Sequence, residues 1–265
     1  MLSEFDAFAP FYDLEHGDYD EDLPFYEALA RRTGSPLLEI GCGTGRLLVP
    51  LAVSGFAVTG VDISSAMLSL ARAKADKAGV GERVHLVQAD ARDLHLDQQY
   101  AMAFISLNTF THFLTRGDQL RLLESVRRHL QPGGILIIDL FNPAVSLARN
   151  MDGQMVHDWI RPQPEGTGKV IKYSSTRLDE AAQKVHVTWF YQVLDSKGND
   201  RWTVLPFSLR YLQRSELELL LERSGFRAER VYGSYELDDF SEDSPRLLAL
   251  ARPAQTENRD LVAGV

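Results

Sequence analysis

The sequence predicts an α/β protein with a doubly wound, mostly parallel sheet and an inserted antiparallel β meander. Two observations predict this class. From Leu37 onward, short apolar runs alternate with helix-like segments, which is typical of βαβ units. After Pro143 the alternation gives way to aromatic-rich runs of period 2, and it resumes near Arg214.

Seven short runs are predicted as strands of the main sheet. They are residues 37–41, 56–62, 83–90, 100–107, 135–141, 227–237 and 244–253. Helices are expected at 46–55, 64–79, 119–130 and 214–225. A serine cap and a terminal glycine mark the second of these helices. The run 135–141 is almost wholly apolar, as expected for a strand buried on both faces.

The interruption, residues 151–211, is predicted as a meander of three strands. Their sequences are KVIKYSSTRL, KVHVTWFYQVL and WTVLPFSLRYL, joined by the turn-like segments DEAAQ and DSKGND. Alternate residues of the middle run share one face: Val185, Val187, Trp189, Tyr191 and Val193. The meander could roof a pocket, form a homodimer surface, or cover the sheet edge with its own small core.

Composition and charge exclude several classes. The net charge of −9 and the absence of a Lys/Arg run disfavour a nucleic-acid partner. The single cysteine, Cys42, excludes an internal disulfide and a cysteine-rich zinc site, and no two histidines stand at HxxxH spacing, so no metal is expected. The apolar runs are too short to cross a membrane, and the acidic N-terminus is unlike a signal peptide. We therefore expect a cytoplasmic protein.

The stretch LLEIGCGTGRLL, residues 37–48, places three glycines between a strand and a helix. Glycines admit positive φ and close approach of a ligand, and the next strand ends in Asp62, an acid suited to a ribose diol. A phosphate-binding P-loop has the pattern GxxxxGK(S/T). It is excluded because position 46 is Arg, with no Lys-Ser after it. Arg46 also counts against a dinucleotide site. S-adenosylmethionine (SAM) is the remaining class.

Five segments in order resemble the motifs of class I SAM-dependent methyltransferases. They are EIGCGTG, VDISSAML, VQADARDL, LQPGGILII and SELELLLERSGF, and the resemblance covers residues 37–252. It implies a Rossmann-like seven-stranded sheet, SAM as cofactor and S-adenosylhomocysteine as its product. The segment SLNTFTHFLT and the N-terminal FAPFYDLEHGDYDEDLPFYEALA resemble the glycine N-methyltransferase and amino-sugar N,N-dimethyltransferase branch.

The resemblance also implies a domain organisation. Residues 1–36 would form N-terminal lid helices, and residues 37–150 with 212–252 the SAM-binding domain. Residues 151–211 would form an acceptor cap or dimer surface, and residues 253–265 a flexible tail.

Ten residues are expected to bind the cofactor by this resemblance: Glu39, Gly41, Gly43, Gly45, Asp62, Ile63, Met67, Asp90, Ala91 and Leu107. The glycines would wrap the methionine and ribose portions, with Glu39 at the amino group and Asp62 at the ribose diol. Ile63 and Met67 would flank the adenine, and Asp90, with the Ala91 amide nearby, would accept from its amino group. Taken alone, a methionine such as Met67 is more often a core residue, and an acid such as Asp90 is more often a strand-end cap.

Three residues are candidates for catalysis. His112 could act as a base or pack beneath its loop. Asn108 could orient the acceptor or close a turn, and Tyr12 could line the lid or lie on its apolar face. His16, in an acidic loop, is expected to be solvated.

The favoured function is methyl transfer to a small molecule, to nitrogen (an amine or amino sugar) rather than oxygen or carbon. The alternatives are a nicotinamide-dependent oxidoreductase and an inactive SAM-binding partner protein.

Overall fold

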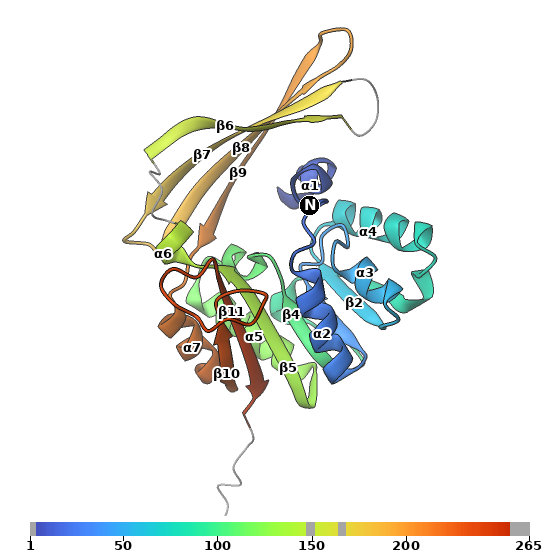
Figure 1. Cartoon of the computed structure of the whole chain (residues 1–265), viewed down its shortest axis with the longest axis vertical. Helices are drawn as coiled ribbons and strands as arrows, with labels where there is room; N and C mark the ends of the chain where they lie inside the picture. The colour runs from blue at the N-terminus through green and yellow to red at the C-terminus, as the bar shows by residue number, and fades with distance from the viewer. Residues whose placement is uncertain (1–3, 147–151, 164–167, 255–265) are drawn as a thin grey trace, which may run out of the picture.

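The computed structural model describes residues 4–146, 152–163 and 168–254 and contains the predicted seven-stranded sheet (Figure 1). The strand order is β10-β11-β5-β4-β1-β2-β3. The strands are β1 (Leu37–Ile40), β2 (Val58–Asp62), β3 (Val84–Gln88), β4 (Tyr100–Ile105), β5 (Leu130–Phe141), β10 (Phe226–Tyr232) and β11 (Arg246–Pro253). Strand β11 is antiparallel to both neighbours and the other pairs are parallel, so the mostly parallel sheet is confirmed.

Helices cover both faces of this sheet, as a doubly wound fold requires. The described helices are α1 (Ala9–His16), α2 (Leu23–Thr33), α3 (Leu48–Val53), α4 (Ser65–Lys77), α5 (Arg116–Arg128), α6 (Pro143–Ser146) and α7 (Arg214–Arg223). Short 3₁₀ turns are η1 (Glu4–Asp6), η2 (Gly81–Arg83), η3 (Ala91–Asp93) and η4 (Thr109–His112). Helices α5 and α7 pack into one apolar cluster with the sheet, and α2, α3 and α4 into another.

Side-chain caps set two helix starts. Ser64 accepts from the Met67 N–H at 3.1 Å and starts α4 where the sequence predicts it. Thr115 accepts from the Asp118 N–H at 3.1 Å, so α5 begins at Arg116 rather than at the predicted Gln119.

The insert is a separate sheet of four strands, not the three predicted. It contains β6 (Asp152–Pro162), β7 (Lys169–Asp179), β8 (Lys184–Leu194) and β9 (Asp200–Arg210), in that order. Strand β6 escapes a period-2 pattern because its register with β7 shifts twice, between Asp152 and Met155 and between His157 and Trp159. The predicted inward face of β8 is confirmed by the burial of Val185, Val187 and Tyr191.

Helix α1 lies between the insert and the edge of the main domain that carries α4 (Figure 1). Of the predicted tail, Pro253 ends β11, and residues 255–265 lie outside the described residues.

Candidate active site

A cavity of about 1240 Å³ opens at the carboxyl ends of the parallel strands β1, β2 and β4. Gly41, Asp62 and Ser106 line it where these strands end. Residues that follow β3, β4 and β5 add to this wall, and the N-terminal segment and strands β7, β8 and β9 of the insert face them. Ligands of open α/β sheets bind at this edge.

Two glycines of the 37–48 stretch line the cavity with left-handed backbones, Gly41 at φ +68° and Gly43 at φ +53°. A Cβ on Gly41 would lie 2.4 Å from Thr109 Cγ2, and one on Gly43 would lie 3.2 Å from the Tyr12 ring. The loop therefore needs glycine for close packing against η4 and α1 as well as for its backbone angles.

Gly45 differs from these two glycines. Its φ is +81°, and a Cβ there would meet Val49 at 3.1 Å and Ala71 at 3.3 Å. It is absent from the described cavity lining, so the structure gives this glycine a role in packing α3 against α4.

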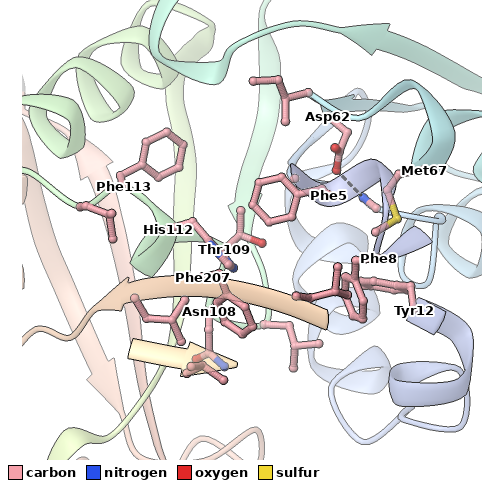
Figure 2. Close-up of a pocket in the computed structure, with 18 of the residues that line it drawn as sticks. Phe5, Phe8, Tyr12, Asp62, Met67, Asn108, Thr109, His112, Phe113 and Phe207 are labelled. Carbon is pink, nitrogen blue, oxygen red and sulfur yellow. Dashed lines mark hydrogen bonds between the residues drawn. The ribbon is translucent and has the colours of Figure 1, made fainter. Parts of the chain in front are cut away.

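Asp62 is the last residue of β2, and its side chain binds the glycine loop that follows β1. Its carboxylate accepts from the Gly43 N–H at 2.9 Å and from the Ser64 N–H at 2.8 Å. Burial raises its pKa above the usual value. Figure 2 shows Asp62 and Met67 on the same side of the cavity, and Ile63 also contributes to the wall.

Asp90 and Ala91 line the cavity beside β3. Asp90 accepts from the Arg92 N–H at 3.0 Å and from the Arg92 side chain at 2.9 Å. The pKa of Asp90 is lowered by this guanidinium, which also binds Asp118 at 2.8 Å. Asp90 is therefore both a turn cap and a cavity residue.

Glu39 is buried on β1, is absent from the described cavity lining, and has an incomplete set of hydrogen-bond partners. Its Oε1 accepts from Ser106 at 3.3 Å, and its Oε2 has no hydrogen-bond partner among the described residues. Burial raises the pKa of Glu39 to about 8. An unpaired buried carboxyl oxygen is costly unless a ligand satisfies it.

Arg46 follows the last glycine of the stretch and binds the segment that precedes α2. Its guanidinium donates to Asp22 at 2.7 and 2.6 Å and to the Tyr19 carbonyl at 2.9 Å. Asp22 is fully buried. This forked pair fixes the segment between α1 and α2 to the loop.

Leu107 and Asn108 line the cavity after β4, both with positive φ, +44° and +68°. Asn108 Oδ1 accepts from the Phe141 N–H at 2.6 Å, and its backbone N–H donates to the Asp139 carbonyl at 3.0 Å. The Asn108 carboxamide thus holds the strained turn that carries η4.

His112 ends η4 and faces the cavity between aromatic rings. Its ring meets Phe5 edge-on, with centroids 5.1 Å apart, and lies 5.9 Å from Phe207. Burial lowers the pKa of His112 to about 4, so the imidazole is neutral near pH 7.

Two residues of α1 also reach the cavity. Tyr12 packs on Gly43, and burial raises its pKa. His16 was expected to be solvated, and this prediction is wrong. Its ring lies 5.0 Å from that of Tyr12, it lines the cavity, and burial lowers its pKa to about 4. The acidic segment around His16 forms part of helix α1, and the insert covers that helix.

The sequence allowed the meander to roof a pocket, and its strands do line the cavity, but sequence reasoning did not assign the aromatic residues of the wall. Phe5 and Phe8 enter from the N-terminal segment, and Trp189 and Phe207 from the insert. Figure 2 shows Phe8 beside Tyr12, and Phe5 and Phe207 near His112. The sequence predicted which residues share one side of β8. It could not predict which part of the molecule that side contacts.

Within the described ranges, no three His, Cys, Asp or Glu side chains gather as metal ligands. The helices of the described chain include none long and apolar enough to cross a membrane.

The sequence is similar to those of known methyltransferases. Residues 37–134 match the methyltransferase domain family. The chain is 27% identical to the cypemycin N-terminal methyltransferase of Streptomyces sp, over 82% of each chain. It is 29% identical to dTDP-3-amino-3,6-dideoxy-alpha-D-glucopyranose N,N-dimethyltransferase of Streptomyces fradiae, over 49% of this chain and 52% of that one.

A solved structure is similar over nearly the whole length. The CcbJ methyltransferase from Streptomyces caelestis superposes with a TM-score of 0.81 at 27% identity, covering 96% of this chain and 98% of that one. The glycine loop, the acid after β2 and these matches lead to one identification. The chain is a class I SAM-dependent methyltransferase, and S-adenosylmethionine is its methyl donor.

Proposed function

We propose that this enzyme transfers the methyl group to nitrogen of a small-molecule amine, an amino sugar included. The carrying observation is one continuous cavity that joins Asp62 and Gly43 to the neutral imidazole of His112. Two relatives support nitrogen, since one is an N-terminal methyltransferase and the other an amino-sugar N,N-dimethyltransferase.

The residues at the Asp62 end fit the cofactor. The unpartnered Oε2 of Glu39 suits its ammonium group, the Asp62 carboxylate suits a ribose diol, and the glycine backbone allows close approach. We assign its seat to Glu39, Gly41, Gly43, Asp62, Ile63, Met67, Asp90, Ala91 and Leu107. When bound, the cofactor supplies an electrophilic methyl group on positively charged sulfur.

The chain's own contribution is alignment and exclusion of water. A neutral amine has a free lone pair and needs no base before attack. His112, neutral and surrounded by Phe5 and Phe207, would accept a hydrogen bond from the acceptor N–H and so aim its lone pair. Asn108 would act as a positioning residue for His112 through its bond to Phe141, and Tyr12 would close the lid over the loop.

The test uses SAM carrying a deuterated methyl group and a library of amines, each paired with its hydroxyl analogue. Mass spectrometry reads which member gains the labelled methyl. The proposal requires transfer to amines; labelled products confined to the hydroxyl or carbon acceptors would refute it. In the same assay His112→Ala should lower kcat with little change in SAM affinity, and an unchanged kcat would make His112 a packing residue.

A homodimer through the insert is a separate part of the proposal. Trp202 and Val204 on β9 are 46% and 51% exposed, which supports a surface available to a second copy. Light scattering should give a dimer mass that Trp202→Ser and Val204→Ser lower to the monomer mass. A monomeric wild type would refute the dimer.

A further inference from the structure

The cavity has two chemically different ends. At the cofactor end, the charged lining residues are Asp62, Asp90, Arg92 and Asp118. At the other end, which we call the acceptor chamber, the insert presents three cross-strand pairs on one face of β8 and β9. These pairs are Val185–Leu209, Val187–Phe207 and Trp189–Leu205.

The acceptor chamber offers no charge to its ligand. Apart from the residues at the cofactor end, the polar groups of the described lining are the hydroxyls of Thr109, Ser146, Ser174, Thr176 and Tyr12, the Asn108 amide and the imidazoles of His16 and His112. All of them are neutral near pH 7, since burial lowers the pKa of each histidine to about 4. They can orient a ligand but cannot balance a charge on it.

Three described cations near the wall, besides Arg46 on Asp22, are also held by carboxylates. Lys172, on β7, pairs with Glu15 and lies 3.5 Å from Asp158, with its ammonium 4.3 Å from the Trp189 ring centroid. Arg92 binds Asp90 and Asp118.

The third cation is Arg246. It pairs with the fully buried Asp139 while reaching Asn108 Oδ1 at 3.4 Å. Freeing any of the three for a ligand anion would leave its carboxylate unpaired.

An anionic acceptor would therefore enter an apolar chamber without a counter-ion. Burying an unpaired charge is strongly unfavourable, and the acids at the cofactor end would repel it further. Nucleoside diphosphates and other phosphorylated carriers are poor ligands for such a wall. An ammonium ion is disfavoured as well, because it has no lone pair to react.

We infer that the acceptor is an uncharged, largely apolar molecule that presents its nucleophilic nitrogen as the neutral amine. An amino sugar would enter as part of such a molecule, not in a phosphorylated or nucleotide-linked form. The inference rests on the proposed function for the nitrogen, whereas the apolar chamber stands on its own lining. In the step, the nitrogen lone pair forms the new carbon–nitrogen bond and the electron pair of the sulfur–methyl bond returns to sulfur. The proton of the resulting ammonium ion leaves to water.

The test measures binding to the full-length protein saturated with S-adenosylhomocysteine, by titration calorimetry near neutral pH. The probes share one ring: 4-propylaniline, which is uncharged; 3-(4-aminophenyl)propanoate, an anion; and 4-aminobenzylphosphonate, which carries phosphorus. We expect the uncharged amine to bind at least about tenfold more tightly than either anion. Equal or tighter binding of an anion would overturn the inference.

A substitution that introduces a charge into the chamber wall gives a second test of the inference. Leu205→Lys puts a cation into the chamber and should reduce the preference for the uncharged probe by about fivefold or more. The matched control is Val204→Lys, one residue along β9 on its exposed face, which should leave the preference unchanged. An equal effect of both substitutions would contradict a charge-free chamber. If Leu205→Lys fails to fold, the wild-type comparison of the three probes still decides.

The two proposals fail in different ways. The phenol 4-propylphenol has the shape of 4-propylaniline and is also uncharged. Binding of both with methylation of the phenol alone would refute nitrogen as the acceptor and leave the apolar chamber intact. Methylation of the amine together with tight binding of the phosphonate would refute the chamber and leave nitrogen intact.

Discussion

Phe11 of α1 lies parallel to Tyr191 of β8, with ring centroids 4.1 Å apart and the planes inclined by 4°. The same helix holds the glycine loop, through Tyr12 on Gly43 and through Asp13, which accepts from Thr44 at 2.7 Å. Helix α1 therefore connects the cofactor end of the cavity to the insert. We therefore expect this connection to loosen when the cofactor leaves.

Phe11→Ala should weaken the connection. Loss of a buried aromatic ring costs about 3–5 kcal/mol when the site cannot collapse, and here part of that cost should appear as lid opening. We expect faster dissociation of S-adenosylhomocysteine in stopped-flow measurements. The matched control is Tyr191→Phe, which keeps the stacked ring and removes a hydroxyl with no partner in the described structure. A dissociation rate unaffected by Phe11→Ala would contradict the lid role.

The Arg46–Asp22 pair should carry much of the stability of the N-terminal segment. Asp22→Asn leaves a buried guanidinium without its counter-charge, and we expect the free energy of unfolding to fall by about 3–5 kcal/mol. Arg31→Gln removes the exposed pair with Glu27 and should cost less than about 1 kcal/mol. Urea denaturation measures both, and equal small losses would show that the buried pair does not anchor the segment.

Glu39 should couple cofactor binding to proton release. With its pKa near 8, Glu39 is mostly protonated near pH 7 in the free protein. The cofactor's ammonium group beside Oε2 would lower that pKa, so binding should release roughly one proton near pH 7 and none above about pH 9. Calorimetry in buffers of different ionisation enthalpy counts these protons. Glu39→Gln should abolish the release, and a wild type that releases no proton would place the ammonium group elsewhere.

His112 should make the protein less stable in acid. Its folded pKa of about 4 lies below its usual value near 6.5, so the unfolded chain binds more protons between those values and stability falls as pH falls through them. Between about pH 7.5 and pH 5 we expect His112 to account for a loss of roughly 1–2 kcal/mol. His112→Gln should remove that share, whereas His95→Gln, at an exposed histidine, should not. Identical pH profiles for wild type and His112→Gln would contradict the buried, neutral imidazole.

Much of this architecture could be predicted from the sequence because the main sheet obeys local rules. Apolar strands, helix caps and terminal glycines each depend on a few consecutive residues, so they can be recognised locally. Seven strands were expected in the main sheet and seven were found. Strand β6 was missed because two register shifts break its alternation. Asp62 was predicted as a ribose-binding acid because it ends the strand that follows the glycine stretch, and it lines the cavity.

The rest of the site depends on contacts that no local pattern records. Gly45 was expected beside the cofactor, and the structure adds a packing role, since a Cβ there would meet Val49 and Ala71. A three-glycine spacing does not show which glycine lines the cavity. His16 was expected in solvent because its neighbours are acidic, yet α1 is covered by an insert more than a hundred residues away along the chain. The aromatic wall likewise joins Phe5 to Phe207.

The most direct test of the central claim, that the cofactor lies over Gly43 with its ribose on Asp62, is calorimetric titration of SAM into matched variants. We predict that Asp62→Ala weakens SAM binding by at least about tenfold, because the buried diol hydrogen bonds to a charged group are lost. Asp97→Ala, at an exposed acid of the β3–β4 connection, should bind like wild type. Wild-type affinity in Asp62→Ala, or an equal loss in both variants, would contradict this placement.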